Sequence, residues 1–162
     1  MQLEIGDGKT VEQVEAYAKV FWQRYRELED GEKMVKKVDD AAHRRDQIAR
    51  QNALIKAKVK DCPSPYQQLA IPYTGQTKGK QYTEEEDRFL LVKMARDHPY
   101  GLDSSYESIK MDICAWPAFR FDWCVGASLN RADRRRFIKS RTPAEIGRRC
   151  TTLVGLIVKE VR

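Results

Sequence analysis

Basic side chains are concentrated in one short stretch of the chain. Between residues 131 and 149 the sequence holds eight lysines and arginines against two acids, a net charge of 8 − 2 = +6. The whole chain has 30 basic and 24 acidic residues and is also +6, so the remainder is neutral. Guanidinium and ammonium groups at this density can neutralise phosphates. A neutral body with one basic segment indicates a specific anionic partner, and a solvated charged face is the alternative interpretation.

The candidate contact residues surround a predicted helix that starts at Thr142. We expect phosphate contacts from Lys139, Arg141, Arg148 and Arg149, further hydrogen bonds from Thr151 and Thr152, and outer help from Lys78, Lys80, Arg134, Arg135 and Arg136. The N-terminal amides of the same helix also favour a phosphate. Such contacts give affinity with little sequence preference, and four to seven of them predict a log–log salt slope of about −4 to −6.

Catalytic and metal-binding motifs are missing from the sequence. It has no G-x-x-x-x-G-K-[ST] loop, no nucleophile elbow and no His–Cys catalytic grouping. The four cysteines show no C-x-x-C spacing and there are two histidines, so we expect no zinc site and reduced thiols of an intracellular protein. We therefore predict that this chain is no enzyme and needs no metal or cofactor.

The bulk composition is typical of helices with one buried stripe and broad solvated faces. The chain has 162 residues, enough for one domain or slightly more, with 41% hydrophobic and 33% charged residues. The N-terminus lacks the basic start and apolar run of a signal peptide, and no stretch approaches a membrane span. We expect no membrane partner.

Helical spacing predicts an all-α fold. Thr10 and Gln13 form a capping box for a helix to about residue 29, whose aromatic stripe we expect to be mostly core. Residues 32–60 lack Pro and Gly and carry only a thin apolar stripe, which indicates a helix that serves as a bridging strut. Two prolines, at 63 and 65, end it.

Three further helices are predicted after residue 82. Thr83 and Glu86 form a capping box. The four acids at 84–87 are expected to interact favourably with the positive end of the helix dipole, and metal binding or acid–base catalysis is the weaker alternative. Asp103 or Ser104 can cap the second helix, and Thr142, Pro143 and Glu145 start the third. The residues expected inside are Tyr106, Ile109, Met111 and Ile113 of the second helix and Ile146, Cys150, Leu153, Leu156 and Ile157 of the third.

The order of these elements resembles the C-terminal region of ISWI-family chromatin remodellers, called HAND–SANT–SLIDE. Residues 21–28 are similar to the last SANT helix, and residues 32–60 correspond to the spacer helix. The entry to the Myb-like SLIDE domain is matched by Tyr73, residues 78–80 and residues 82–89. Residues 119–123, 140–142, 148–150 and 152–153 match its remainder.

This resemblance implies a domain order and a function. It implies the end of SANT at 1–30, a spacer helix at 31–61, a linker at 62–81 and SLIDE at 82–162. HAND and most of SANT are missing from the match, so we expect a portion of a longer, nuclear, ATP-dependent remodeller whose motor lies elsewhere. The implied partners are linker DNA and nucleosomes. The alternatives are a protein-interaction module for histone tails or accessory subunits, and a purely structural ruler.

One segment departs from the family pattern. Residues 124–136 separate two motifs that are nearly adjacent in the family, and they carry a net charge of 4 − 1 = +3. Two explanations remain open: a genuine basic loop, or a retained intron read in frame. Without the segment, the basic positions at Lys139, Arg141, Arg148 and Arg149 remain.

Overall fold

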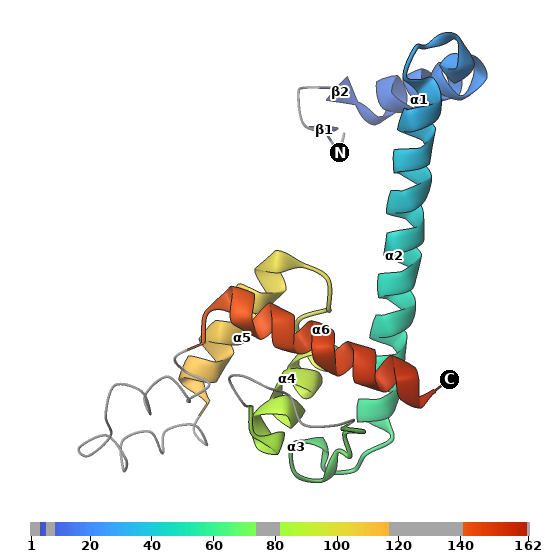
Figure 1. The fold of residues 1–162 in the computed structure, drawn as a ribbon. Helices are drawn as coiled ribbons and strands as arrows, with labels where there is room; N and C mark the ends of the chain where they lie inside the picture. Colours follow the sequence, from blue (N-terminus) through green and yellow to red (C-terminus); the bar gives the residue numbers. More distant parts are fainter. Residues whose placement is uncertain (1–3, 6–8, 74–81, 117–140, 162) are drawn as a thin grey trace. The chain divides into compact units, whose positions relative to one another are not determined.

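The computed structural model describes residues 4–5, 9–73, 82–116 and 141–161. Within these ranges the strands are limited to a short antiparallel ladder between β1 (Glu4–Ile5) and β2 (Lys9–Thr10), and the remaining elements are helices joined by turns and loops (Figure 1). The helices are α1 (Val11–Arg24), the 3-10 turn η1 (Tyr25–Glu27), α2 (Gly31–Lys60), α3 (Pro65–Gln68), α4 (Glu84–Arg96), α5 (Asp103–Ala115) and α6 (Pro143–Glu160). The predicted all-α class is confirmed.

The chain forms two compact units, Met1–Asp46 and Gln47–Arg162, and the boundary between them falls within α2. In the first unit the predicted capping box is confirmed: the Thr10 N–H donates to Gln13 Oε1 at 3.0 Å, and the Gln13 N–H donates to Thr10 Oγ1 at 3.3 Å. Helix α1 ends at Arg24 and continues as η1, so the regular helix is shorter than expected.

The aromatic stripe of α1 is not core, contrary to the expectation from sequence. No residue of α1 is buried, and the Tyr17 and Trp22 side chains are 71% and 48% exposed. The rings of Phe21, Trp22 and Tyr25 pack against one another instead, with centroids 5.5 to 6.3 Å apart. Periodicity identified the stripe correctly, but no other described element of this unit supplies a surface that covers it.

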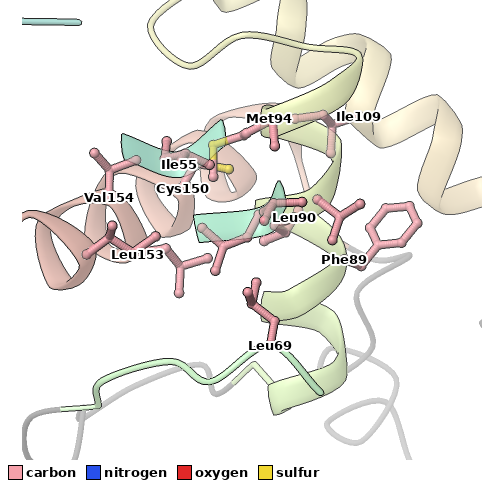
Figure 2. Close-up of a cluster of buried hydrophobic side chains, with 14 of the residues drawn as sticks. Ile55, Leu69, Phe89, Leu90, Met94, Ile109, Cys150, Leu153 and Val154 are labelled. Carbon is pink, nitrogen blue, oxygen red and sulfur yellow. The ribbon is translucent and has the colours of Figure 1, made fainter. Parts of the chain in front are cut away.

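The core of the second unit is built by α4, α5 and α6 together with the end of α2 (Figure 2). Ile55 and Val59 of α2 are buried, as are Leu69 and Ile71 from the segment around α3. Residues 32–60 were expected to form a bridging strut, and for the last turns of α2 this prediction is wrong. Those turns contribute hydrophobic side chains to the same core as the other three helices.

A reciprocal pair of hydrogen bonds holds α2 against the turn between α4 and α5. The Asn52 amide donates to the Tyr100 carbonyl at 3.0 Å, and its oxygen accepts from the Tyr100 N–H at 2.9 Å. The next residue, Gly101, has φ +97°, and a Cβ there would lie 2.9 Å from Ile48. A side chain at residue 101 would thus be strained and would also collide with α2.

The boundaries of α4 and α5 test two capping predictions. Thr83 and Glu86 form the predicted box at the start of α4. The cap predicted at Asp103 or Ser104 is wrong, because α5 begins at Asp103 and its N-cap, Leu102, makes no side-chain hydrogen bond.

Helix α5 also corrects one predicted core residue. Met111 was expected inside with Ile109 and Ile113, but it is 74% exposed while both isoleucines are fully buried. Met111 is two residues from each isoleucine, about 200° around a helix, and therefore faces away from them. The aromatic residues at 119, 121 and 123 and the insertion at 124–136 lie outside the described residues.

Candidate nucleic-acid interface

Helix α6 is positioned by a start signal and a buried stripe that the sequence predicted. The Thr142 Oγ1 accepts from the Glu145 N–H at 3.3 Å, Glu145 accepts from the Thr142 N–H at 3.0 Å, and Pro143 occupies the first turn. Ile146, Cys150, Leu153 and Ile157 are buried as expected, and Val154 joins them. This stripe packs α6 against α4 and α5 and fixes which side faces solvent (Figure 2).

The solvent face of α6 carries two cations separated by small or short side chains. We call it the α6 outer face; its exposed residues are Ala144, Arg148, Thr151, Thr152, Gly155 and Lys159. The spacings of 4, 7 and 11 residues after Arg148 place Thr152, Gly155 and Lys159 on the same side of a helix. Among the described residues, neither Arg148 nor Lys159 makes an ion pair; the Arg148 Nε donates to the Ala144 carbonyl at 3.3 Å.

Thr151 and Thr152 lie on this face, but their hydroxyl protons are directed back onto the helix. The Thr151 hydroxyl donates to the Gly147 carbonyl at 3.0 Å, and the Thr152 hydroxyl donates to the Arg148 carbonyl at 3.1 Å. Each hydroxyl has one proton to donate. In this arrangement the two threonines present low, short side chains rather than hydrogen-bond donors aimed outward.

Arg149 is turned inward and belongs to a buried ion pair. Its Nε donates to Asp87 Oδ1 at 2.8 Å, and its Nη2 donates to Asp87 Oδ2. The Asp87 side chain is fully buried and that of Arg149 is 12% exposed. Asp87 also accepts a 2.8 Å hydrogen bond from the Tyr73 hydroxyl. The hydrogen bond to Asp87 raises the pKa of Arg149 despite the opposing effect of burial.

Arg141 is also interior, with 1% of its surface exposed. Its guanidinium carbon lies 4.8 Å from the centroid of the Tyr82 ring, and that of Arg149 lies 5.2 Å from the same centroid. Tyr82 therefore makes cation–π contacts with two arginines. Burial raises the pKa of Tyr82 to about 12, with Arg141 acting in the opposite direction.

The structure thus divides the expected contact residues. Arg148, Thr151 and Thr152 share the α6 outer face, while Arg141 and Arg149 lie around Tyr82 in the interior. The remaining candidates, Lys78, Lys80, Lys139, Arg134, Arg135 and Arg136, lie outside the described residues. Lys159 was missed, although its spacing of 11 from Arg148 identifies it once α6 is known to extend to Glu160.

A second cluster of polar side chains occurs where α4 ends against α5. Asp97, His98 and Asp112 place potential metal-ligand atoms within 4.8 Å of one another. The Lys93 ammonium lies 2.9 Å from carboxylate oxygens of both aspartates, and His98 Nε2 lies 2.9 Å from Asp112. A lysine therefore already supplies positive charge to both carboxylates, so the geometry is that of an ion-pair cluster.

In the described part of the chain, no helix has the length and hydrophobicity that a membrane span requires.

Comparison with known proteins places this architecture in a family. The SLIDE family model matches residues 32–161, a range that includes nearly all of α2. The chain is 40% identical over 156 residues to the human SWI/SNF-related matrix-associated actin-dependent regulator of chromatin subfamily A member 1, covering 95% of this chain and 13% of that protein. It is also 40% identical over 157 residues to the Arabidopsis thaliana ISWI chromatin-remodeling complex ATPase CHR17, with the same coverage.

A third relative is the Saccharomyces cerevisiae ISWI chromatin-remodeling complex ATPase ISW2, 35% identical over 156 residues. The chain spans about an eighth of the length of each of these proteins, at 12% to 13%. A match of this kind covers one region of a remodeller and not its whole chain. The protein described here belongs to the SLIDE family and corresponds to the SLIDE region of ISWI chromatin remodellers.

Proposed function

We propose that this chain is the DNA-binding module of a nuclear, nucleosome-spacing chromatin remodeller, and that it binds linker DNA outside the nucleosome core. The ATPase motor lies elsewhere in the parent polypeptide, as the names of the ISWI relatives suggest. The observation that carries the proposal is the α6 outer face, which presents Arg148 and Lys159 to solvent. Arginine and lysine side chains that neutralise DNA phosphates release condensed counterions, which gives affinity with little dependence on base sequence. A module that binds linker DNA needs affinity of this kind.

The charge of this face argues against histone tails as its first partner. Histone tails are basic and bind acidic surfaces, whereas the charged side chains of the α6 outer face are those of Arg148 and Lys159. Glu160, beside Lys159, accepts hydrogen bonds from Lys58 at 2.7 and 2.9 Å. Its charge is therefore already balanced within the unit. Binding of accessory remodeller subunits is the second candidate, and the exposed aromatic side chains of α1 favour it.

The interior position of Arg141 and Arg149 changes which residues carry the proposal. An arginine that pairs with a buried aspartate is already neutralised, and a phosphate would have to displace that carboxylate. We therefore assign contacts to Arg148 and Lys159 within the described part of the chain. Lys139, Lys78, Lys80 and the arginines at 134–136 remain proposed contributors on the basis of their charge.

The test is a duplex-DNA titration over a salt series with charge-reversal variants. Arg148→Glu with Lys159→Glu should weaken binding to duplexes of unrelated sequence alike and reduce the magnitude of the salt slope by about 2. Lys56→Glu with Lys60→Glu, at exposed positions of α2, makes the same change in net charge and is the control, which should change affinity little. Unchanged affinity in the α6 double variant, or a selective loss for one sequence, would contradict the proposal. A parallel pull-down with histone peptides measures the competing function.

A further inference from the structure

The last turn of α6 lies beyond the part of the helix that the core holds firmly. Ile157 is the last fully buried side chain of α6, Val158 packs only partly against the core, and Lys159 and Glu160 are exposed. The helix ends at Val161 in a right-handed backbone conformation, without the left-handed glycine that ends many helices. The last carbonyl groups of a helix have no partner within it. The core and the helix end therefore give little support to the turn that carries Lys159.

Glu160 connects this turn to α2 through an ion pair. The Lys58 ammonium donates to Glu160 Oε2 at 2.7 Å and to Glu160 Oε1 at 2.9 Å. The Lys58 side chain is 19% exposed, and the next residue of α2, Val59, is buried in the core. Lys58 is thus held firmly, whereas the Glu160 side chain is 40% exposed. Within the described ranges, no other ion pair joins α2 to α6.

An acid is unfavourable at this end of a helix. The C-terminal end of the helix dipole carries partial negative charge, which repels a carboxylate. Glu160 is the last residue of α6, whereas the other acid of the helix, Glu145, lies in the first turn, where negative charge is favourable. Helix formation gives no reason for an acid at residue 160, and the ion pair with Lys58 does.

We propose that Lys58 and Glu160 are positioning residues, which tie the last turn of α6 to α2 and so hold Lys159 in place for contact with a DNA phosphate. This inference rests on the proposed function, in which Lys159 is a contact residue. It adds a role for two residues that are not themselves assigned to DNA contact. Without the tie, the last turn of α6 frays, and the Lys159 side chain is correctly placed in only part of the molecules.

The tie can be removed without a change in net charge. Lys58→Met with Glu160→Met should lower affinity for duplex DNA about threefold, which is the effect of one partly exposed ion pair. The magnitude of the salt slope should fall by up to about 1, as the Lys159 contact is weakened. Lys58→Glu with Glu160→Lys restores an ion pair of reversed polarity and should recover most of the loss.

A second ion pair provides the matched control. Lys33 Nζ lies 2.7 Å from Asp30 Oδ1 at the start of α2, in the other compact unit. Asp30→Met with Lys33→Met also removes an ion pair at constant net charge. This control should leave duplex affinity and the salt slope unchanged.

The experiment measures binding of the full 162-residue chain to a short DNA duplex across a salt series, in the parent and in a Lys159→Met background. If the tie acts through Lys159, the effect of Lys58→Met with Glu160→Met should disappear in that background, because the contact that the tie positions is already lost. A general loss of structure would persist there. Circular dichroism and the melting temperature check that each variant is folded.

The outcomes separate this inference from the proposed function. An effect of Lys58→Met with Glu160→Met that is present in the parent and absent in the Lys159→Met background supports the tie. The inference is overturned if the tie variant binds like the control variant, or equally weakly in both backgrounds, while Lys159→Met itself weakens binding. If Lys159→Met and Arg148→Glu with Lys159→Glu leave duplex affinity unchanged, the proposed function itself is wrong.

Discussion

Arg149 donates two hydrogen bonds to the fully buried carboxylate of Asp87, across the packing of α6 on α4. The two residues are 62 positions apart in sequence. The charges of the segment around each of them predicted a role other than this ion pair. Asp87 lies among the four acids expected to favour the positive end of α4. Arg149 lies among the arginines expected to contact DNA. Their pairing gives both residues a structural role at the centre of the fold.

Loss of Arg149 should therefore reduce stability more than DNA binding. Arg149→Met leaves the Asp87 carboxylate buried without its cation and should lower the free energy of unfolding by about 3 kcal/mol, measured by urea denaturation. Arg148→Met, on the exposed outer face, should change it by no more than about 0.5 kcal/mol. In titrations with duplex DNA the order of the two effects should reverse, so that Arg148→Met weakens binding more than Arg149→Met does. Equal stability of the two variants would contradict the assignment of Arg149 to the interior.

The Asn52–Tyr100 pair should stabilise the packing of the C-terminal half of α2 within the second unit. Asn52→Ala leaves both the N–H and the carbonyl of Tyr100 without this partner and should cost about 2 kcal/mol in unfolding free energy. Gln47→Ala, at an exposed position of the same helix, provides the control. If both substitutions prove equally mild in chemical denaturation, the reciprocal hydrogen bonds do not hold α2 in place.

The cluster around Asp112 predicts a pH-dependent contribution to stability. Burial alone would raise the pKa of Asp112, but hydrogen bonds from Lys93 and His98 outweigh it and the pKa is lowered. A lowered folded-state pKa stabilises the protein above the unfolded pKa of about 3.9, and that stabilisation is lost as the pH falls through the folded value. Asp112→Asn should therefore be less stable than the parent at pH 7 and equal to it in strong acid.

Thermal melts from pH 7 down to pH 2 measure this difference. Asp61→Asn, at an exposed position after α2, is the control for the loss of one carboxylate. A stability difference for Asp112→Asn that stays constant down to the lowest pH would show that its charge is not responsible.

The cysteines should differ sharply in reactivity. Burial raises the pKa of the Cys150 thiol to about 12, and the charge of Asp87 acts in the same direction. Cys114 is exposed on α5. Because the thiolate is the reactive form, alkylation at pH 8 should label Cys114 within the native protein and Cys150 only after unfolding. Peptide mass spectrometry identifies the labelled residues, and rapid native labelling of Cys150 would exclude the packed arrangement of α6.

Local sequence patterns predicted the long helices, three of their N-terminal caps and much of the core of the second unit. Capping boxes at Thr10, Thr83 and Thr142 depend on residues three positions apart, and the buried stripe of α6 depends on helical periodicity. Both are local rules that need no knowledge of distant contacts. The misplacement of Met111 in the core came from applying the period too loosely, and the same rule corrects it.

Which charged and aromatic side chains are exposed depends on contacts between helices that are distant in sequence. Arg148 and Arg149 are neighbours in one basic pair, yet one faces solvent and the other binds Asp87 from α4. The aromatic stripe of α1 stays exposed, whereas the thin stripe at the end of α2 is buried. Charge and periodicity describe a residue within its own helix. Burial and pairing depend on what a helix distant in sequence places opposite it, and that information is available only once the chain is folded.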